Sequence, residues 1–258
     1  MTLQDIIHII ESAAPLSYQE AWDNSGLQVG DASADIRAAL LTTDITESVV
    51  GEAVSLGCNL IISHHPLLFR GLKHVCGTTP QERCVAKAIK QDIAIYSAHT
   101  SMDAYLRGVS GRMAETMGIT DYRILVPAAG SESKYGLGVV GCLPTALSYE
   151  TFLQQLKQRF GAPYLRYTRA VRESVQKVAF CGGAGAEFAE SAIAAGADVY
   201  VTADVKYHEM QAADGQIALV DMDHWVSEHL VRDVFRELLQ AHLPVYISQR
   251  DSTPVLTM

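Results

Sequence analysis

Segments with the apolar pattern of buried strands alternate with segments of helical periodicity along almost the whole chain. Strands are expected at 38–42, 60–63, 93–97, 137–143, 164–168, 175–181, 199–202, 217–220 and 245–249. Helices are expected at 3–13, 46–56, 80–90, 149–160, 186–195, 207–213 and 225–241. This alternation is typical of α/β proteins in which most strands run parallel. The sequence therefore predicts an α/β fold with mixed, mainly parallel sheets.

A turn-rich stretch divides the chain into two halves. Residues 128–136 read AAGSESKYG, which is small, polar and rich in turn formers, so we place a domain boundary there. The predicted parts are an N-terminal α/β lobe (1–128), a second α/β lobe (129–235) and a C-terminal segment (236–258) that returns to the first lobe. Residues 39–65 also lie over 178–204 without a gap. Either two similar, interlinked lobes or the rhythm common to all α/β units explains that match.

Composition narrows the class of protein. Apolar residues make up 48% and charged residues 19%, as in folded globular proteins, which excludes disorder. The 20 Lys and Arg against 29 Asp and Glu give a net charge of −9. That charge disfavours nucleic-acid binding unless cations gather in one channel, for which the candidates are Arg70, Lys73, Arg107 and Arg112. No apolar run is long enough to span a membrane, and the five cysteines show no CxxC spacing. We expect a cytoplasmic protein with reduced cysteines and no membrane partner.

Two adjacent histidines follow the strand 60–63 directly. His64 and His65 precede Pro66, which ends strand pairing and places both imidazoles in a loop at the carboxyl end of the strand. A second loop follows the strand 93–97 and contains His99 and Asp103. A polar strand end and an aspartate that caps a turn explain these loops equally simply when each is taken alone.

A third loop follows the strand 217–220. His224 and Glu228 are four residues apart at the expected start of a helix, so their side chains share one face. A solvated helix N-terminus is the alternative explanation. Together the three loops predict one set of ligands: His64, His65, Asp103, His224 and Glu228. Three imidazoles and two carboxylates suit two divalent metal ions, Zn, Fe or Mn. His99 is a sixth ligand, an orienting residue or a general base.

Two further segments offer candidate substrate-binding residues. The sequence CGGAGAEF (181–188) joins a strand to a helix, and its glycines Gly182 and Gly183 would let backbone amides approach a phosphate. A tight strand-to-helix turn explains the same glycines. The segment after the strand 199–202 provides Asp204, Lys206 and His208, which would line a substrate pocket or form local ion pairs. His208, like His99, is a candidate proton carrier.

The chain resembles the Nif-three-like family, which includes YbgI and the GTP cyclohydrolase I type 2 homologues. The matching strings are AWDNSGLQVG (21–30), LIISHHPLLF (60–69), SAHTSMD (97–103), FCGGAGAEF (180–188), ADVYVTADVKYHE (197–209) and DMDHWVSE (221–228). The resemblance implies a two-lobed α/β subunit, a dinuclear metal site in the cleft between the lobes and a ring-shaped homohexamer. It also implies the ligands His64, His65, Asp103, His224 and Glu228. The family often has glycine where this chain has Ala203 and Asp223.

The ligand set and the resemblance together predict a metal-dependent hydrolase. The expected substrate is a small molecule, a purine nucleotide whose ring is opened at a C–N bond, as in a cyclohydrolase. A non-enzymatic metal carrier or a ring protein that uses the ions structurally would need the same residues. Processing of damaged nucleotides or DNA is a third reading, which the net charge of −9 disfavours for tight duplex binding.

Overall fold

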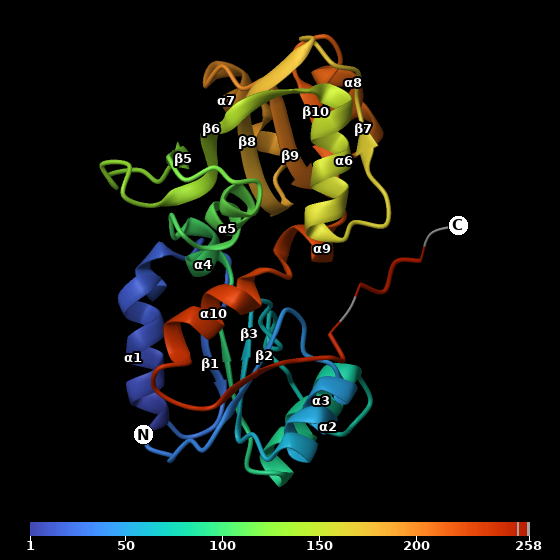
Figure 1. Cartoon of the computed structure of the whole chain (residues 1–258). Helices are drawn as coiled ribbons and strands as arrows, with labels where there is room; N and C mark the ends of the chain where they lie inside the picture. Colours follow the sequence, from blue (N-terminus) through green and yellow to red (C-terminus); the bar gives the residue numbers. More distant parts are fainter. Residues whose placement is uncertain (252, 257–258) are drawn as a thin grey trace. The chain divides into compact units, whose positions relative to one another are not determined.

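The computed structural model describes residues 1–251 and 253–256 and shows two compact units, each with its own sheet (Figure 1). The first unit comprises Met1–Met102 and the described residues 231–251. The second comprises Asp103–Leu230 and the described residues 253–256. The short helix α4 (Thr100–Ala104) carries the chain from the first unit into the second.

The first unit contains a five-stranded sheet in the order β1-β4-β3-β2-β11. Its strands are β1 (Gly26–Val29), β2 (Ala39–Thr42), β3 (Leu60–Ser63), β4 (Ala94–Ser97) and β11 (Val245–Ile247). Its helices are α1 (Leu3–Ala13), the 3-10 turn η1 (Leu16–Tyr18), α2 (Glu47–Leu56), α3 (Pro80–Lys90) and α10 (Val231–Leu239). β11, β2, β3 and β4 run parallel, and only β1 is antiparallel to its neighbour β4.

Alternate residues of this sheet face opposite helix layers. Leu40, Ile61 and Ile95 pack in the core formed with α2 and α3. Tyr96 points to the other face, where its hydroxyl donates to Glu11 of α1, and α10 packs beside α1. The predicted ends of α2 are confirmed: the Thr46 side chain accepts from Val49 N, and Gly57 ends the helix with a left-handed φ of 71°.

The second unit contains a six-stranded sheet in the order β5-β6-β8-β9-β10-β7. Its strands are β5 (Tyr122–Pro127), β6 (Gly136–Ser148), β7 (Arg166–Tyr167), β8 (Ser174–Ala184), β9 (Val199–Ala203) and β10 (Ala218–Asp221). Its helices are α5 (Val109–Thr116), α6 (Tyr149–Phe160), η2 (Ala186–Phe188), α7 (Ala189–Ala194), α8 (Tyr207–Ala213) and α9 (His224–Glu228). β8, β9 and β10 run parallel, and the other described pairings are antiparallel.

Each face of this second sheet has its own core. Phe180 and Val201 pack with Phe152 of α6 and Val226 of α9 on one face. Tyr200 and neighbours pack with α7 and α8 on the other. The α/β class and the mixed sheets are therefore confirmed. Both units contain three adjacent parallel strands, β2-β3-β4 and β8-β9-β10, and the internal sequence match aligned β2 with β8 and β3 with β9.

Two local expectations require correction. The turn-rich residues 128–136 connect β5 to β6, which pair antiparallel, so this stretch lies within the second unit as a hairpin loop. The expected helix 225–241 is two helices, α9 and α10. His229 Nδ1 lies 3.0 Å from Val226 O, the carbonyl that would accept from Leu230 N–H in a continuous helix. The chain passes from the second unit to the first at this break.

Candidate metal-binding site

The carboxyl ends of three parallel strands meet at one edge of the first unit's sheet. Thr42, Ser63 and Ser97 are in register as the last residues of β2, β3 and β4. The residues that follow them, 43–44, 64–65 and 98–99, therefore share one edge, where parallel sheets present their functional loops. Hydrogen bonds fix the edge: Ser63 and Ser97 Oγ are 2.8 Å apart, and Ser63 Oγ donates to His65 O.

Three imidazoles gather at this edge, and we call them the histidine group: His64, His65 and His99. Their ring centroids lie 5.0 to 5.4 Å apart. One ligand nitrogen of each lies within 4.8 Å of the others, which is close enough to hold a metal ion. His64 is fully buried, whereas the side chains of His65 and His99 are 24% and 16% exposed. The structure thus brings together the two adjacent histidines and the predicted proton carrier His99.

Each ring of the histidine group is held at Nδ1 by an oxygen. His64 Nδ1 lies 3.0 Å from Ala98 O, and His65 Nδ1 lies 2.8 Å from Asp44 Oδ1. His99 Nδ1 lies 2.8 Å from Asp23 Oδ1. A carbonyl or carboxylate oxygen only accepts, so Nδ1 carries the proton and Nε2 carries the lone pair. Oxygen acceptors orient metal-ligating histidines in this way.

Asp23 is the most enclosed of these acceptors, with a fully buried side chain. It accepts from His99 Nδ1, from Thr100 N and Oγ1, and from Ser25 Oγ. Burial alone would raise the pKa of its carboxyl, but the hydrogen bonds from His99 and Thr100 outweigh burial and hold that pKa well below its usual range. Asp23 is therefore a carboxylate at neutral pH.

The second unit places His224 and Glu228 together at the start and end of α9. His224 Nε2 lies 3.1 Å from Glu228 Oε2, and His224 Nδ1 lies 2.8 Å from Asp204 Oδ2. Glu228 is buried, whereas the His224 side chain is 36% exposed. The predicted sharing of one helix face is confirmed, because Nε2 of His224 lies beside the carboxylate of Glu228.

Asp103 lies on α4, four residues after His99. Its charge acts on the Cys181 thiol of β8, as does that of Glu228, so both carboxylates lie near that sulfur. Burial, with these charges, raises the pKa of Cys181 to about 12. Cys181 is therefore a neutral thiol at physiological pH, in keeping with an oxygen and nitrogen donor set.

The glycines of the CGGAG turn have a structural role. A Cβ on Gly182 would overlap Val109, and one on Gly183 would overlap Glu228 Oε1. Gly183 also has a left-handed φ of 66°. Their N–H groups donate to Ser110 Oγ and Ser227 Oγ, so the structure commits both amides to internal bonds and not to a phosphate.

The remaining predicted substrate residues separate into two roles. Asp204 Oδ2 lies 2.8 Å from Nδ1 of His224, so Asp204 holds the ring of a predicted ligand. Lys206 and His208 are exposed at the start of α8, and His208 Nδ1 faces Gln211 Oε1 at 3.3 Å. No described contact brings either side chain to His224.

The backbone at position 223 would suit the glycine that the family resemblance implies there. Asp223 has a left-handed φ of 70°, a conformation that glycine adopts without strain. Its side chain compensates by capping α9, since Oδ1 accepts from Val226 N. Ala203, the other departure, is the buried last residue of β9 and has no left-handed φ.

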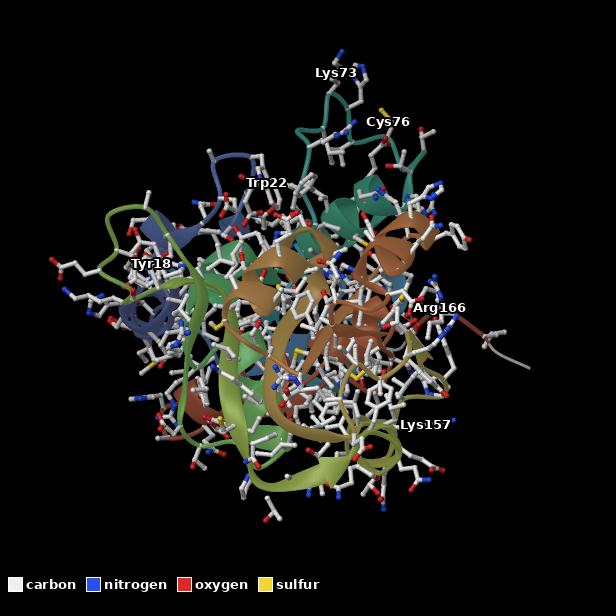
Figure 2. The ribbon with its side chains drawn as sticks, turned by 90° about the horizontal axis from the view of Figure 1, so that it is seen from above. Tyr18, Trp22, Lys73, Cys76, Lys157 and Arg166 are labelled. Carbon is white, nitrogen blue, oxygen red and sulfur yellow. The ribbon has the colours of Figure 1, made fainter. Side chains whose placement is uncertain are left out.

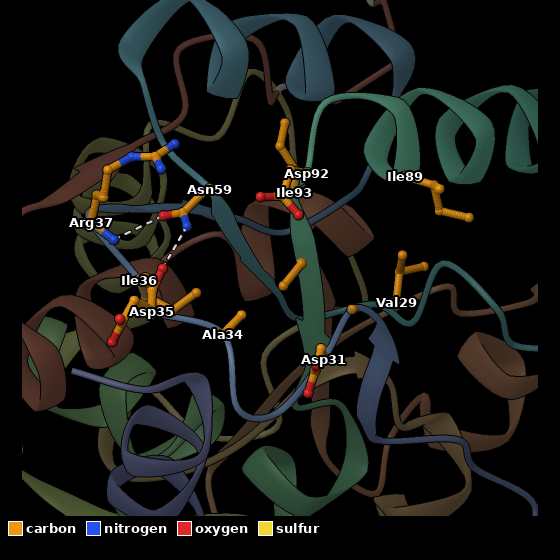
Figure 3. A pocket seen from close by; sticks show the side chains of 12 residues that line it. Val29, Asp31, Ala34, Asp35, Ile36, Arg37, Asn59, Ile89, Asp92 and Ile93 are labelled. Carbon is orange, nitrogen blue, oxygen red and sulfur yellow. Dashed lines mark hydrogen bonds between the residues drawn. The ribbon is translucent and has the colours of Figure 1, made fainter.

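A cavity of about 470 Å³ lies at the opposite edge of the first unit's sheet (Figure 3). It is lined where the parallel strands begin, by Asn59, Ile93 and Ala94, together with Asp31 and Arg37. Asn59 accepts from Arg37 N and donates to Asp35 O, which closes the loop before β2 against β3. None of the predicted ligand or substrate residues lines this cavity.

Sequence reasoning missed the carboxylates that orient the histidines, Asp23 and Asp44. Asp44 is the second residue after β2, just as His65 is the second residue after β3, so a search of the residues that follow each strand would have found it. Asp23 is 76 residues from His99 in the sequence, and its only signal is the WDN string.

Among the described residues no helix is long and apolar enough to cross a membrane. The fold and these side chains define an α/β protein with oriented histidine and carboxylate groups that could hold metal ions. Residues 1–254 match the family model described as Duf34/NIF3 (NGG1p interacting factor 3). The chain belongs to this family.

Relatives and solved structures agree with that assignment. A Clostridium perfringens protein named GTP cyclohydrolase 1 type 2 homolog is 33% identical over 98% of both chains. The crystal structure of a hypothetical protein from Staphylococcus aureus has a TM-score of 0.91 at 26% identity and covers 100% of this chain and 99% of its own. A Bacillus cereus protein related to NIF3 has a TM-score of 0.89 at 25% identity, with the same coverage.

Proposed function

We propose that the protein is a metal-dependent hydrolase with a dinuclear centre held by His64, His65, Asp103, His224 and Glu228. The proposed substrate is a purine nucleotide, cleaved at a C–N bond. Relatives named GTP cyclohydrolase 1 type 2 homolog support this choice of substrate.

The observation that carries the proposal is the orientation of the histidines. His64 and His65 have Nδ1 held by an oxygen, which leaves Nε2 as the metal donor. His224 Nδ1 likewise faces Asp204, and its Nε2 lies beside Glu228 Oε2, the atom of the other predicted ligand on α9. Imidazole nitrogens and carboxylates are the ligands that Zn, Fe and Mn accept, and the nearby thiol of Cys181 is neutral. The donor set therefore fits divalent metal ions of this kind.

Bound divalent ions would supply Lewis acidity that activates water and polarises an electrophilic carbon. The chain's own residues orient the ligands, carry protons and contact the substrate. Asp44 and Asp204 keep His65 and His224 in position. His99 is the proposed proton carrier, because Asp23 holds its ring at Nδ1 and so fixes the direction of Nε2. Lys206, exposed at the start of α8, is the proposed phosphate contact, and His208 beside it is a second proton carrier.

The test begins with protein purified without chelators. Elemental analysis is expected to find two Zn, Fe or Mn ions per chain, and the loaded protein is expected to hydrolyse GTP or another purine nucleotide in a panel. His64→Ala and Glu228→Gln should lose metal and turnover. His242→Ala replaces an exposed histidine that is not among the predicted ligands, and it should keep both the metal and the turnover.

A double variant tests whether the ligands serve one dinuclear centre. If they do, the loss of metal-binding free energy in His64→Ala, His224→Ala will differ from the sum of the losses in the two single variants. Additive losses would assign the histidines to independent sites. Metal binding without turnover on the whole panel would favour a metal carrier or a structural role. The homohexamer is likewise a prediction, which analytical ultracentrifugation tests.

A further inference from the structure

Two large aromatic side chains of the first unit are exposed side by side. Trp22 is 60% exposed and Phe69 is 46% exposed, and their ring centroids lie 6.0 Å apart with planes at 57°. They come from different loops, Trp22 from the loop before β1 and Phe69 from the loop after β3. We call them the aromatic pair. Covering such rings with another apolar surface is favourable, because it removes apolar area from water.

The aromatic pair adjoins the histidine group. Trp22 lies 6.0 Å from the ring of His99 at 71°, and Phe69 lies 6.4 Å from it at 80°. These are edge-on contacts, and together with the contact inside the aromatic pair they make a cluster in which each of the three rings contacts the other two. A flat molecule resting on the pair would therefore place its edge close to the nitrogens of the histidine group.

Hydrogen bonds tie the two loops together and hold the pair in place. Asn24 Nδ2 donates to Leu68 O at 2.6 Å, and Leu68 N donates to Gln28 Oε1 at 3.2 Å. Gln28 Nε2 in turn donates to Asn24 O at 2.7 Å. Asp23, beside Trp22, is buried under His99. Because both rings are anchored by their neighbours in sequence, a ligand would pay little entropy to order them.

The loop that provides Phe69 is also cationic. Residues 66–79 contain Arg70, Lys73 and His74 and no Asp or Glu, in a chain of net charge −9. Arg70 and Lys73 are exposed, and Figure 2 shows Lys73 at the outer end of this loop. A positive segment next to exposed aromatic rings suits a ligand that combines a flat ring with an anionic group.

We propose that Trp22 and Phe69 bind the planar heteroaromatic ring of the substrate, one by stacking on its face and the other, tilted by 57°, by contact with its edge. Arg70 and Lys73 bind its phosphate groups. The inference rests on the proposed function for the choice of a nucleotide, but binding by stacking does not require turnover. It assigns the substrate specificity of the histidine group to two loops of the first unit.

Tryptophan fluorescence tests the proposal directly, because the chain has two tryptophans and only Trp22 is in the pair. Titration of chelator-treated protein with GTP is expected to quench the emission, and Trp22→Phe should remove most of that quenching. Inorganic triphosphate should cause none, since it has no ring to stack. A single-stranded oligonucleotide shows whether the ring is taken from a free nucleotide or from a polymer.

Affinities separate stacking from a structural effect. Stacking on an aromatic residue corresponds to about a 5- to 150-fold weaker Kd on truncation to alanine. Trp22→Ala and Phe69→Ala should each weaken GTP binding within that range and raise KM more than they lower kcat. Tyr246→Ala removes an equally exposed aromatic ring from β11 of the same unit, at 43% exposure, and should leave the Kd unchanged. Arg70→Ala should weaken the binding of both GTP and inorganic triphosphate.

Two results would overturn the inference. One is GTP binding by Trp22→Ala and Phe69→Ala, both folded by circular dichroism, with the affinity of the parent protein. The other is dissociation of a larger assembly by these variants with no change in GTP affinity, which would assign the pair to contacts between copies. Quenching without turnover would leave the inference standing and refute only the hydrolase.

Discussion

Asp204→Asn tests whether carboxylates orient the metal-binding histidines. Asp204 Oδ2 lies 2.8 Å from His224 Nδ1, and Asp204 has a left-handed φ of 54°. Asparagine has nearly the same shape and tolerates the left-handed conformation, so the substitution changes the charge of the acceptor with little effect on the backbone.

The magnitude follows from the type of hydrogen bond and its exposure. A hydrogen bond to a charged group contributes about 1.5–3 kcal/mol, and a neutral one about 0.5–1.5 kcal/mol. Asp204 is 55% and His224 36% exposed, so solvent screening places the difference near its lower limit, about 1 kcal/mol. Metal affinity should fall about fivefold to tenfold, at or just below the low end of the range for residues that orient metal ligands.

A competition titration against a chromophoric chelator measures that affinity. Asp121→Asn, a change at an exposed aspartate of the same unit, serves as the matched control and should bind metal like the parent protein. His224→Ala defines the affinity that remains when a ligand is lost. An Asp204→Asn affinity within about twofold of the parent would refute the orienting role, and a loss as large as that of His224→Ala would make Asp204 itself a ligand.

Two other changes give predictions of different kinds. Gly183→Ala places a Cβ against Glu228 Oε1 at a left-handed φ, so it should lower the free energy of unfolding by about 1–3 kcal/mol and weaken metal binding. Urea denaturation measures the first effect and the chelator titration the second. An unchanged free energy of unfolding would show that Glu228 moves freely. Asp23 has a lowered folded pKa, so it stabilises the fold at pH values above its unfolded pKa of about 3.9, and this stabilisation is lost as the pH falls toward the folded value. Asp23→Asn should therefore flatten the fall of stability below about pH 4, and an equally steep fall in both proteins would contradict the assignment.

The sequence by itself was sufficient for the class of fold and for most residues of the candidate site. Strand and helix patterns are local, so α2 could be placed between Thr46 and Gly57 from its capping residues. The search for polar residues directly after each expected strand is also local, because it needs only the residues that follow each apolar segment. That is why His64 and His65 at one edge, and the pair of His224 and Glu228, could be chosen before the fold was known.

Only the tertiary structure decided which carboxylates orient the rings of those histidines. The contact of Asp23 with His99 joins positions 76 residues apart, and the contact of Asp204 with His224 depends on the register of neighbouring strands. The hairpin of β5 and β6 similarly decides that residues 128–136 are a loop and not a boundary. A sequence pattern records the preferences of each segment, whereas these contacts depend on where distant segments lie once their apolar faces are buried.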